Sequence, residues 1–190
     1  MNTPHAREHA NTKSSFHFEP NGTLIVKDAA ILFSNFAGNP DTYHPNGGNR
    51  VFNLVLSDQF ADILKNEGWN VKGRENQDGD ITYMTEIRVN MESNWPPMVV
   101  LYSEFRGRKT STVLDVDSIG RLDSGRYSNI KMAINPHEHN VGQYKVKGYL
   151  RELRLIAEPE NGYFSDMDDE YLAAESEHPM EAAGEELPFV

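Results

Sequence analysis

The fold is decided by the longest candidate strand of the chain, residues 143–156, which reads QYKVKGYLRELRLI. Successive side chains of a strand point to opposite faces, so one face of this strand is basic and aromatic. That face carries Lys145, Lys147, Tyr149 and Arg151, and the other carries Tyr144, Val146, Gly148 and Leu150. Leu153 and Leu155 break the alternation, which predicts a one-residue slip near Arg151.

Shorter candidate strands precede this one. Residues 81–89 alternate with a period of two, and several other segments are rich in strand-forming residues. These segments are residues 23–36, 50–56, 69–73, 98–105 and 127–135. In the first of them, around a bend near Asp28, we expect four core residues: Leu24, Val26, Ile31 and Phe33. A short helix capped by Asp58 should end before Gly68. Five or six strands with one or two short helices indicate an all-β fold, a small closed or half-closed barrel.

The charge of the chain is divided unevenly. Residues 158–190 hold eleven acidic side chains and neither Lys nor Arg, so the rest of the chain carries 18 acids and 18 bases. The net charge of −11 therefore belongs to the tail. A neutral body with clustered bases can hold a phosphate backbone, which a uniformly acidic domain would repel.

Composition predicts three regions: a disordered leader over residues 1–15, one domain over residues 16–157 and a disordered acidic tail over residues 158–190. The tail offers little apolar surface to offset the entropy of ordering. The absence of Cys excludes a disulfide framework and Cys-ligated zinc. The chain has no run of about eighteen apolar residues. We therefore expect a soluble cytoplasmic protein with no membrane partner.

Other segments also place a cation within a few residues of an aromatic ring. This interleaving is typical of proteins that bind single-stranded nucleic acid through base stacking and phosphate contacts. The residues are Arg50, Phe52, Trp69, Lys72, Tyr102, Arg106, Arg108 and Lys109. With the basic face of residues 143–156 they form the predicted DNA-binding set, although the rings, Phe52 above all, suit a core equally well.

Two parts of the chain resemble known DNA-binding proteins. The chain ends in an apolar hook after two acids: Glu185, Glu186, Leu187, Pro188, Phe189 and Val190. This ending resembles the tip of bacterial single-stranded DNA-binding proteins, in which Phe is the last residue, whereas Val190 follows Phe189 here. The body resembles phage-type single-stranded DNA-binding proteins with an OB-fold, in residues 35–40, 49–52, 68–72 and 114–123.

The resemblance implies an OB-fold-like barrel that coats single-stranded DNA, without strong sequence preference, during phage replication or recombination. It implies no catalysis, cofactor or metal, a location in the host cytoplasm, and a tail that recruits replication or recombination proteins. A tail of about thirty residues has an end-to-end distance of roughly 30 Å, so it could also reach the basic face and compete with DNA. Homo-oligomerisation stays open.

Two other functions are compatible with the residues. A metal-dependent nuclease could use Asp115, Asp117 and Asp123 with His137, Glu138 and His139. Residues 115–123, however, have the composition of a capped turn, and residues 136–140 that of a hairpin loop. An OB-fold adaptor or an acidic mimic of DNA would bind protein alone. Mimics carry acid over the folded surface, and the body here is balanced.

Overall fold

The computed structural model describes residues 14–105, 107–139 and 144–158, apart from the side chain of Phe105. The predicted leader and acidic tail lie outside these residues, except for Ser14, Ser15 and Glu158. Within the described part of the chain, no helix is long and apolar enough to cross a membrane.

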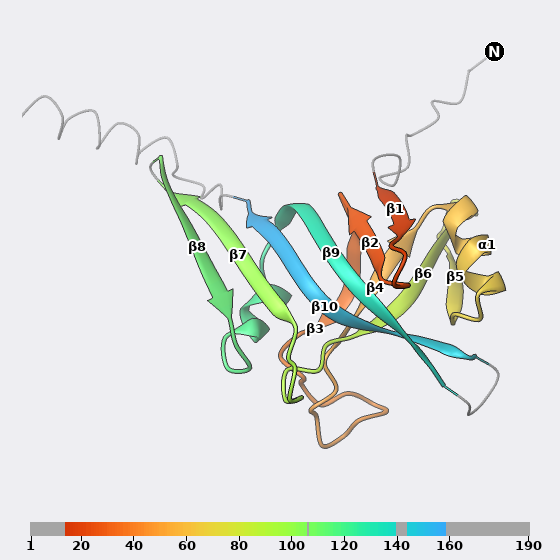
Figure 1. The fold of residues 1–190 in the computed structure, drawn as a ribbon, viewed down its shortest axis with the longest axis horizontal. Coiled ribbons are helices and arrows are strands. Elements are labelled where there is room, and N and C mark those ends of the chain that lie inside the picture. Colours follow the sequence, from red (N-terminus) through yellow and green to blue (C-terminus); the bar gives the residue numbers. More distant parts are fainter. Residues whose placement is uncertain (1–13, 106, 140–143, 159–190) are drawn as a thin grey trace, which may run out of the picture. The chain divides into compact units, whose positions relative to one another are not determined.

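The described residues form ten strands, one α-helix and one 3-10 helix (Figure 1). In chain order the elements are β1 (Ser15–Phe18), β2 (Leu24–Lys27), β3 (Ile31–Asn35), β4 (Val51–Leu56), α1 (Asp58–Asn66), β5 (Val71–Glu75), β6 (Ile81–Arg88), β7 (Met98–Phe105), β8 (Arg108–Leu114), η1 (Ile119–Asp123), β9 (Tyr127–Glu138) and β10 (Val146–Ala157).

All ten strands belong to one sheet. Its main path runs β1-β2-β9-β10-β6-β4-β3, with β5 added to β6 and the β7–β8 hairpin added to β10. Strand β10 is antiparallel to β9 and parallel to β6 and β7, and Figure 1 shows it between β9 and β7. The sheet stays open, because its end strands β1 and β3 do not pair with each other.

The predicted all-β class is confirmed, and the open sheet is consistent with an OB-like fold. The strands outnumber the five or six expected because short hairpin partners, such as β1 and β8, carry too few alternating residues to stand out in the sequence. Helix α1 begins one residue earlier than expected. Ser57, and not Asp58, is its N-cap and accepts a hydrogen bond from the Phe60 amide.

One face of the sheet, which we call the inner face, carries the core. Its residues are Leu24, Val26, Phe52, Leu54, Ile87, Met132, Ile134, Leu150, Leu153 and Leu155. Helix α1 adds Phe60 and Leu64 to this core, and η1 adds Ile119 and Leu122. Burial of such side chains contributes about 1.5–3 kcal/mol each. The other face of the sheet, the outer face, is therefore the one left available for binding.

The predicted slip in the last strand is confirmed. The register of β10 against β9 shifts between Leu150 and Glu152, so Arg151 is the extra residue of a bulge. Leu150 lies inside before the bulge, and Leu153 and Leu155 lie inside after it. The bulge thus returns the leucines to the core and leaves Arg151 exposed.

The segments that carry the family resemblance hold the long loop of residues 36–49 to the rest of the fold. The Asp123 carboxylate accepts hydrogen bonds from the amides of Phe36 and Ala37, each 2.8 Å long. The Asn35 side chain accepts from the Asn39 amide and donates to the Asn39 and Asn49 carbonyls. These contacts position the loop beside β4.

Candidate nucleic-acid interface

The outer face is defined by the pairing of the strands. Residues opposite each other on neighbouring strands project to the same side of a sheet. Tyr149 of β10 is opposite Asn135 of β9 and Arg88 of β6, and Lys147 is opposite His137. None of these five side chains is buried. They form the centre of the outer face.

The outer face is strongly basic. On strands β2, β5, β6, β9 and β10 it carries eight cations: Lys27, Lys72, Arg74, Arg88, Lys131, Lys147, Arg151 and Arg154. The same strands place two acids there, Glu86 and Glu152. The inner face is apolar, so the positive charge of these strands is segregated to one side. A predominantly positive surface of this kind attracts a polyanion.

The two outer-face acids of these five strands lie beside arginines. Glu86 is 3.8 Å from Arg88, and Glu152 accepts a hydrogen bond from Arg154. Arg154 also donates to the Tyr102 hydroxyl at 2.7 Å. The Glu152 contact first, and then the Tyr102 contact, raises the pKa of Arg154. Lys27, Lys131, Lys147 and Arg151 form no ion pair with any described residue.

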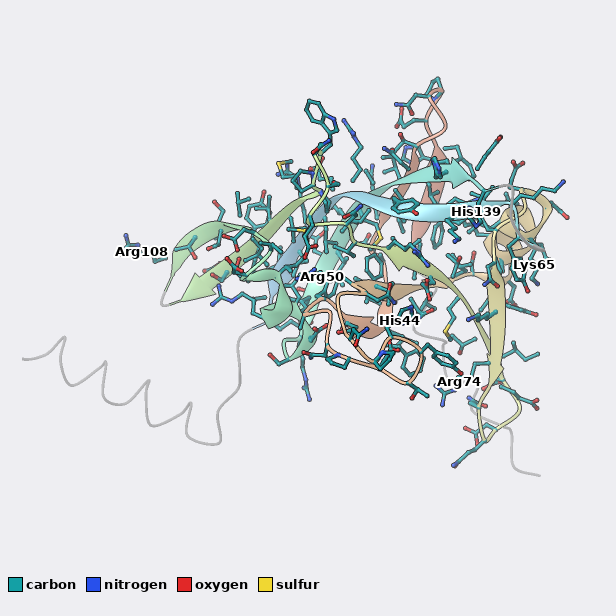
Figure 2. All side chains as sticks on the ribbon, turned by 90° about the horizontal axis from the view of Figure 1, so that it is seen from below. His44, Arg50, Lys65, Arg74, Arg108 and His139 are labelled. Atoms are coloured by element: carbon teal, nitrogen blue, oxygen red, sulfur yellow. The ribbon has the colours of Figure 1, made fainter. Side chains whose placement is uncertain are left out.

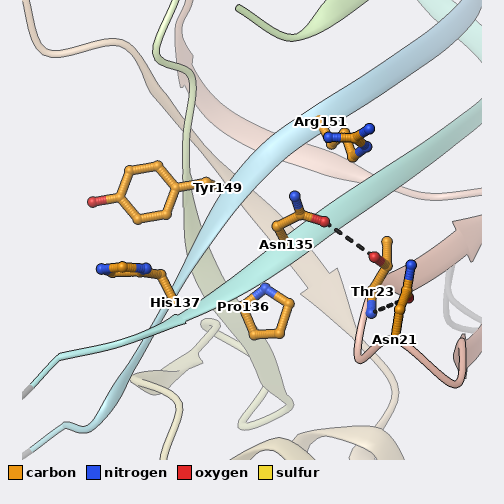
Figure 3. A pocket seen from close by; sticks show the side chains of 7 residues that line it. All are labelled: Asn21, Thr23, Asn135, Pro136, His137, Tyr149 and Arg151. Carbon is orange, nitrogen blue, oxygen red and sulfur yellow. Dashed lines mark hydrogen bonds between the residues drawn. The ribbon is translucent and has the colours of Figure 1, made fainter. Parts of the chain in front are cut away.

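A groove of about 780 Å³ opens at the centre of the outer face (Figure 3). Tyr149 and His137 form its aromatic side, with ring centroids 5.9 Å apart and ring planes at 90°. Arg151 lies further along β10, and Asn135 accepts a hydrogen bond from the Thr23 hydroxyl at 3.1 Å. The groove therefore combines rings, a guanidinium and neutral polar groups.

A second groove, of about 440 Å³, adjoins the first. The two share Asn135, Tyr149 and Arg151 in their linings. Trp95, from the loop between β6 and β7, lines the second groove and is 90% exposed. Two rings, Tyr149 and Trp95, thus line the same groove as the Arg151 guanidinium, an arrangement that suits stacked bases and a phosphate backbone.

A match to a family model identifies the protein family to which this chain belongs. The model described as "Putative phage ssDNA-binding domain" matches residues 13–161. The chain belongs to this family. The matched residues include every described strand, and the predicted resemblance to phage single-stranded DNA-binding proteins is confirmed.

Solved structures similar to this chain include the single-stranded DNA-binding protein from bacteriophage Enc34. Its complex with ssDNA is 11% identical with a TM-score of 0.45, and the match covers 82% of this chain and 95% of that one. A second structure of the Enc34 protein is 12% identical with a TM-score of 0.43, and the match covers 87% of this chain and 97% of that one. Its C-terminal truncation is 11% identical with a TM-score of 0.43, over 74% and 88%. No curated protein matches the sequence.

In this member of the phage ssDNA-binding domain family, part of the predicted set lies at the grooves or elsewhere on the exposed basic surface. Tyr149 and Arg151 line both grooves, and Lys147 lies beside them on the outer face. Lys145 immediately precedes β10 and is exposed, and Lys72 lies on the outer face of β5. The role of these five residues in binding DNA stays a prediction.

Two rings of the predicted set are in the core, and their assignment to DNA binding was wrong. Phe52 is 0% exposed and packs against Phe36, with ring centroids 5.5 Å apart. Trp69 is 3% exposed and lies against Gly148, where an added Cβ would come within 2.6 Å of the indole. Both rings are on the inner side, so neither can stack on a base in this conformation.

Two other predicted residues are engaged within the protein. The Arg50 side chain is 13% exposed and donates to Glu92 at 3.1 Å, so its charge is partly screened. Tyr102 lies on the outer face, where its hydroxyl accepts the hydrogen bond from Arg154. Neither residue lines the two central grooves.

The basic hairpin tip lies away from the centre of the outer face. Figure 2 shows Arg108 at the opposite end of the described part from Arg74 and His139. Lys109 is 3.8 Å from Glu104 across the β7–β8 hairpin. Arg106 lies outside the described residues, as do residues 185–190 of the predicted partner-binding tip. The structure therefore does not bring Arg108 and Lys109 of the β7–β8 hairpin together with Tyr149.

Sequence reasoning missed Trp95 and misplaced Phe33. Trp95 sits in a Trp-Pro-Pro turn, and a large ring fixed by two prolines in a loop was the available signal. Phe33, expected in the core, is 56% exposed. The register of β3 against β4 shifts between Leu32 and Asn35, and this bulge turns Phe33 away from the inner face.

Two aspartates of the nuclease alternative, Asp115 and Asp123, have structural roles. Asp115 accepts hydrogen bonds from the Ser118 hydroxyl and amide, and these bonds lower the pKa of its carboxyl. His137 and Glu138 belong to β9, so the predicted hairpin loop begins later than expected. Within the part of the chain that the structure describes, no three His, Asp or Glu side chains are grouped to hold a metal ion.

Proposed function

We propose that this chain binds single-stranded DNA along the outer face of its sheet, without strong sequence preference and without catalysis. The observation that carries the proposal is the meeting of Tyr149, Trp95 and Arg151 in two adjoining grooves on a basic face. The family match supports it independently. Rings and flexible cations bind any base sequence, because every base has a face to stack and every nucleotide a phosphate.

The expected interaction is electrostatic in large part. Each phosphate neutralised by a cation releases counterions, so the logarithm of the affinity should fall with the logarithm of salt by about 0.7 per phosphate. Each stacked base should add about 1–3 kcal/mol that depends less on salt. Single strands should be preferred over duplex, since paired bases cannot leave their stack to meet Tyr149 or Trp95.

A fluorescence titration of labelled single-stranded and duplex DNA at several salt concentrations tests the proposal. We expect Arg151→Gln and Lys147→Gln to weaken single-strand binding. Arg121→Gln is the matched control, because Arg121 is an exposed cation on η1, which packs on the core side of the sheet. Equal binding by all three variants, or no preference for single strands, would refute the proposal and favour a protein-binding adaptor.

The biological context that we propose is phage DNA replication or recombination in the host cytoplasm, with the acidic tail recruiting partner proteins through residues 185–190. The same tail should compete with DNA for the outer face, since it is anionic and the face is basic. A chain ending at Glu158 should bind single-stranded DNA more tightly at low salt than the full chain. Thermal unfolding of both forms controls for stability, and equal affinities would exclude the competition.

A further inference from the structure

Phe33 has an unusual environment for a ring in a strand. It lies in β3 and is 56% exposed, and its φ angle is +50°. Bulky residues rarely adopt a left-handed conformation, and a bulge with positive φ normally uses Gly. The strained backbone therefore holds an aromatic side chain in solvent at a position where a residue without a side chain would be easier to accommodate.

Phe33 has a cationic partner on the outer face. The Arg74 guanidinium lies over the ring, 4.9 Å from its centroid. Arg74 is opposite Thr82 and two residues after Lys72, so it projects to the outer side of β5. Strands β4 and β6 lie between β3 and β5 in the sheet. The contact therefore spans two strands on the same face that carries Tyr149.

The pair is separated from the central grooves by a basic stretch. Tyr149 is opposite Arg88 at one end of β6, and Arg74 is opposite Thr82 near the other end. Six residues of strand correspond to about 20 Å. Lys72 lies beside this part of β6 on the same face. The span fits a site of several nucleotides, within the range of about 4–16 nucleotides per OB-fold.

We propose that Phe33 and Arg74 form a second base-stacking site, so that one DNA strand crosses the outer face from Trp95 and Tyr149 to Phe33. This inference rests on the proposed function and extends it to the far end of the sheet. A base would stack on the exposed side of Phe33, and Arg74 would contact the adjoining phosphate. Arginine suits this position because its planar group can lie against a ring and still bind an oxygen.

A simpler role for Phe33 is to cover buried residues, and the test must distinguish this role from base stacking. Val55 and Met84 are opposite each other on the outer side of β4 and β6, yet they are only 7% and 6% exposed. An apolar side chain at position 33 could serve only to shield them. Leu would provide such a cover, whereas a stacking site needs an aromatic ring, so the two roles predict different results for Phe33→Leu.

The test compares Phe33→Leu, Phe33→Tyr and Tyr149→Ala on a short and a long single-stranded oligonucleotide. Leu32→Ala is the matched control, because Leu32 is an exposed apolar neighbour, 40% exposed, on the same strand. We expect Phe33→Leu to weaken the long oligonucleotide about 5-fold or more, since stacking contributes about 1–3 kcal/mol per base. Phe33→Tyr and Leu32→Ala should bind like the original chain, and the short oligonucleotide should depend on Tyr149 alone.

The outcomes separate this inference from the proposed function. If Tyr149→Ala weakens both oligonucleotides and Phe33→Leu weakens neither, the second site is refuted and the proposed function stands. If no variant changes binding, or the unaltered chain binds no single-stranded DNA, both fall. Photocrosslinking of a bromouridine-substituted strand provides a second readout that does not depend on folding of a variant. A crosslinked peptide containing Phe33 supports the site, and crosslinks confined to Tyr149 and Trp95 overturn it.

Discussion

The inner and outer faces of the sheet contain the same kinds of ring in opposite environments. Phe52 and Trp69 are 0% and 3% exposed on the inner side, whereas Phe33 and Trp95 are 56% and 90% exposed. Phe52 and Trp69 each have a cation within three residues in the sequence, whereas the nearest cations to Phe33 and Trp95 are six and seven residues away. The comparison teaches that proximity to a cation along the chain does not identify a stacking ring. The face to which the strand or loop directs the ring identifies it.

The largest expected effect is on the inner face. Phe52→Ala removes a fully buried ring that packs against Phe36, and it should lower the free energy of unfolding by about 3–5 kcal/mol. Denaturant titration measures this loss. DNA affinity per folded molecule should stay unchanged at a temperature where the variant is folded. A specific loss of affinity in fully folded Phe52→Ala would break the distinction between the two faces.

A smaller loss of stability is expected at Gly148, which is buried on the inner face of β10. Gly148→Ala would place a Cβ 2.6 Å from the Trp69 ring and 2.7 Å from the Ile87 side chain. Overpacking of this kind costs about 1–3 kcal/mol. Gly22→Ala is not a clean control because of its positive φ, so we choose Ala133→Gly on β9 for comparison. Unchanged thermal unfolding of Gly148→Ala would show that Trp69 can move outward.

On the outer face, the ring of Tyr149 should control affinity and not stability. Tyr149→Ala should weaken single-strand binding by about 1–3 kcal/mol, with a small change in the melting temperature, since the side chain is only partly buried. Tyr149→Phe keeps the ring and should bind like the original chain. A loss in Tyr149→Phe equal to that in Tyr149→Ala would assign the effect to the hydroxyl and not to stacking.

Removal of single cations from the outer face should change the salt dependence more than the affinity at high salt. Lys131→Gln should reduce the logarithmic salt slope by about 0.7 if Lys131 neutralises one phosphate. Titrations at four or more salt concentrations give the slope. Lys65→Gln, on α1 and paired with Asp62 at 3.2 Å, is the control. Equal slopes for Lys131→Gln and the original chain would show that Lys131 neutralises no phosphate and that the DNA track does not pass it.

The smallest effect is expected at the β7–β8 hairpin. Lys109 is already close to Glu104, and exposed ion pairs of this kind contribute about 0–1 kcal/mol. Lys109→Gln should therefore leave stability and DNA affinity almost unchanged. If it weakens binding as much as Arg151→Gln, the hairpin belongs to the interface, and the track is longer than the central grooves and the Phe33 site indicate.

Much of the fold could be predicted because it depends on local pattern. The period of two in residues 81–89 places Ile87 inside, and the broken alternation after Leu150 predicts the bulge at Arg151. The strand count was too low because β1 and β8 are defined by their partners and not by their own residues. The open ends of the sheet depend on pairings between distant segments, which a pattern in one strand does not contain.

The candidate site was predicted only in part for a related reason. Tyr149 and Arg151 could be assigned to a basic face from the strand that contains them. Trp95 reaches their groove because the loop before β7 folds back beside β10, and Phe33 reaches the outer face because of a bulge in a short strand. Neither arrangement leaves a periodic signal, so both rings were missed.

The sequence by itself determined the all-β class, the family resemblance and the alternation that separates basic from apolar side chains along the last strand. These properties follow from neighbours in the chain. Only the tertiary structure decided that Phe52 and Trp69 complete the core, while Tyr149, Trp95 and Phe33 face solvent. The exposure of a ring depends on which strands pair beside it and where a bulge reverses the faces, and both are set by contacts between residues far apart in sequence.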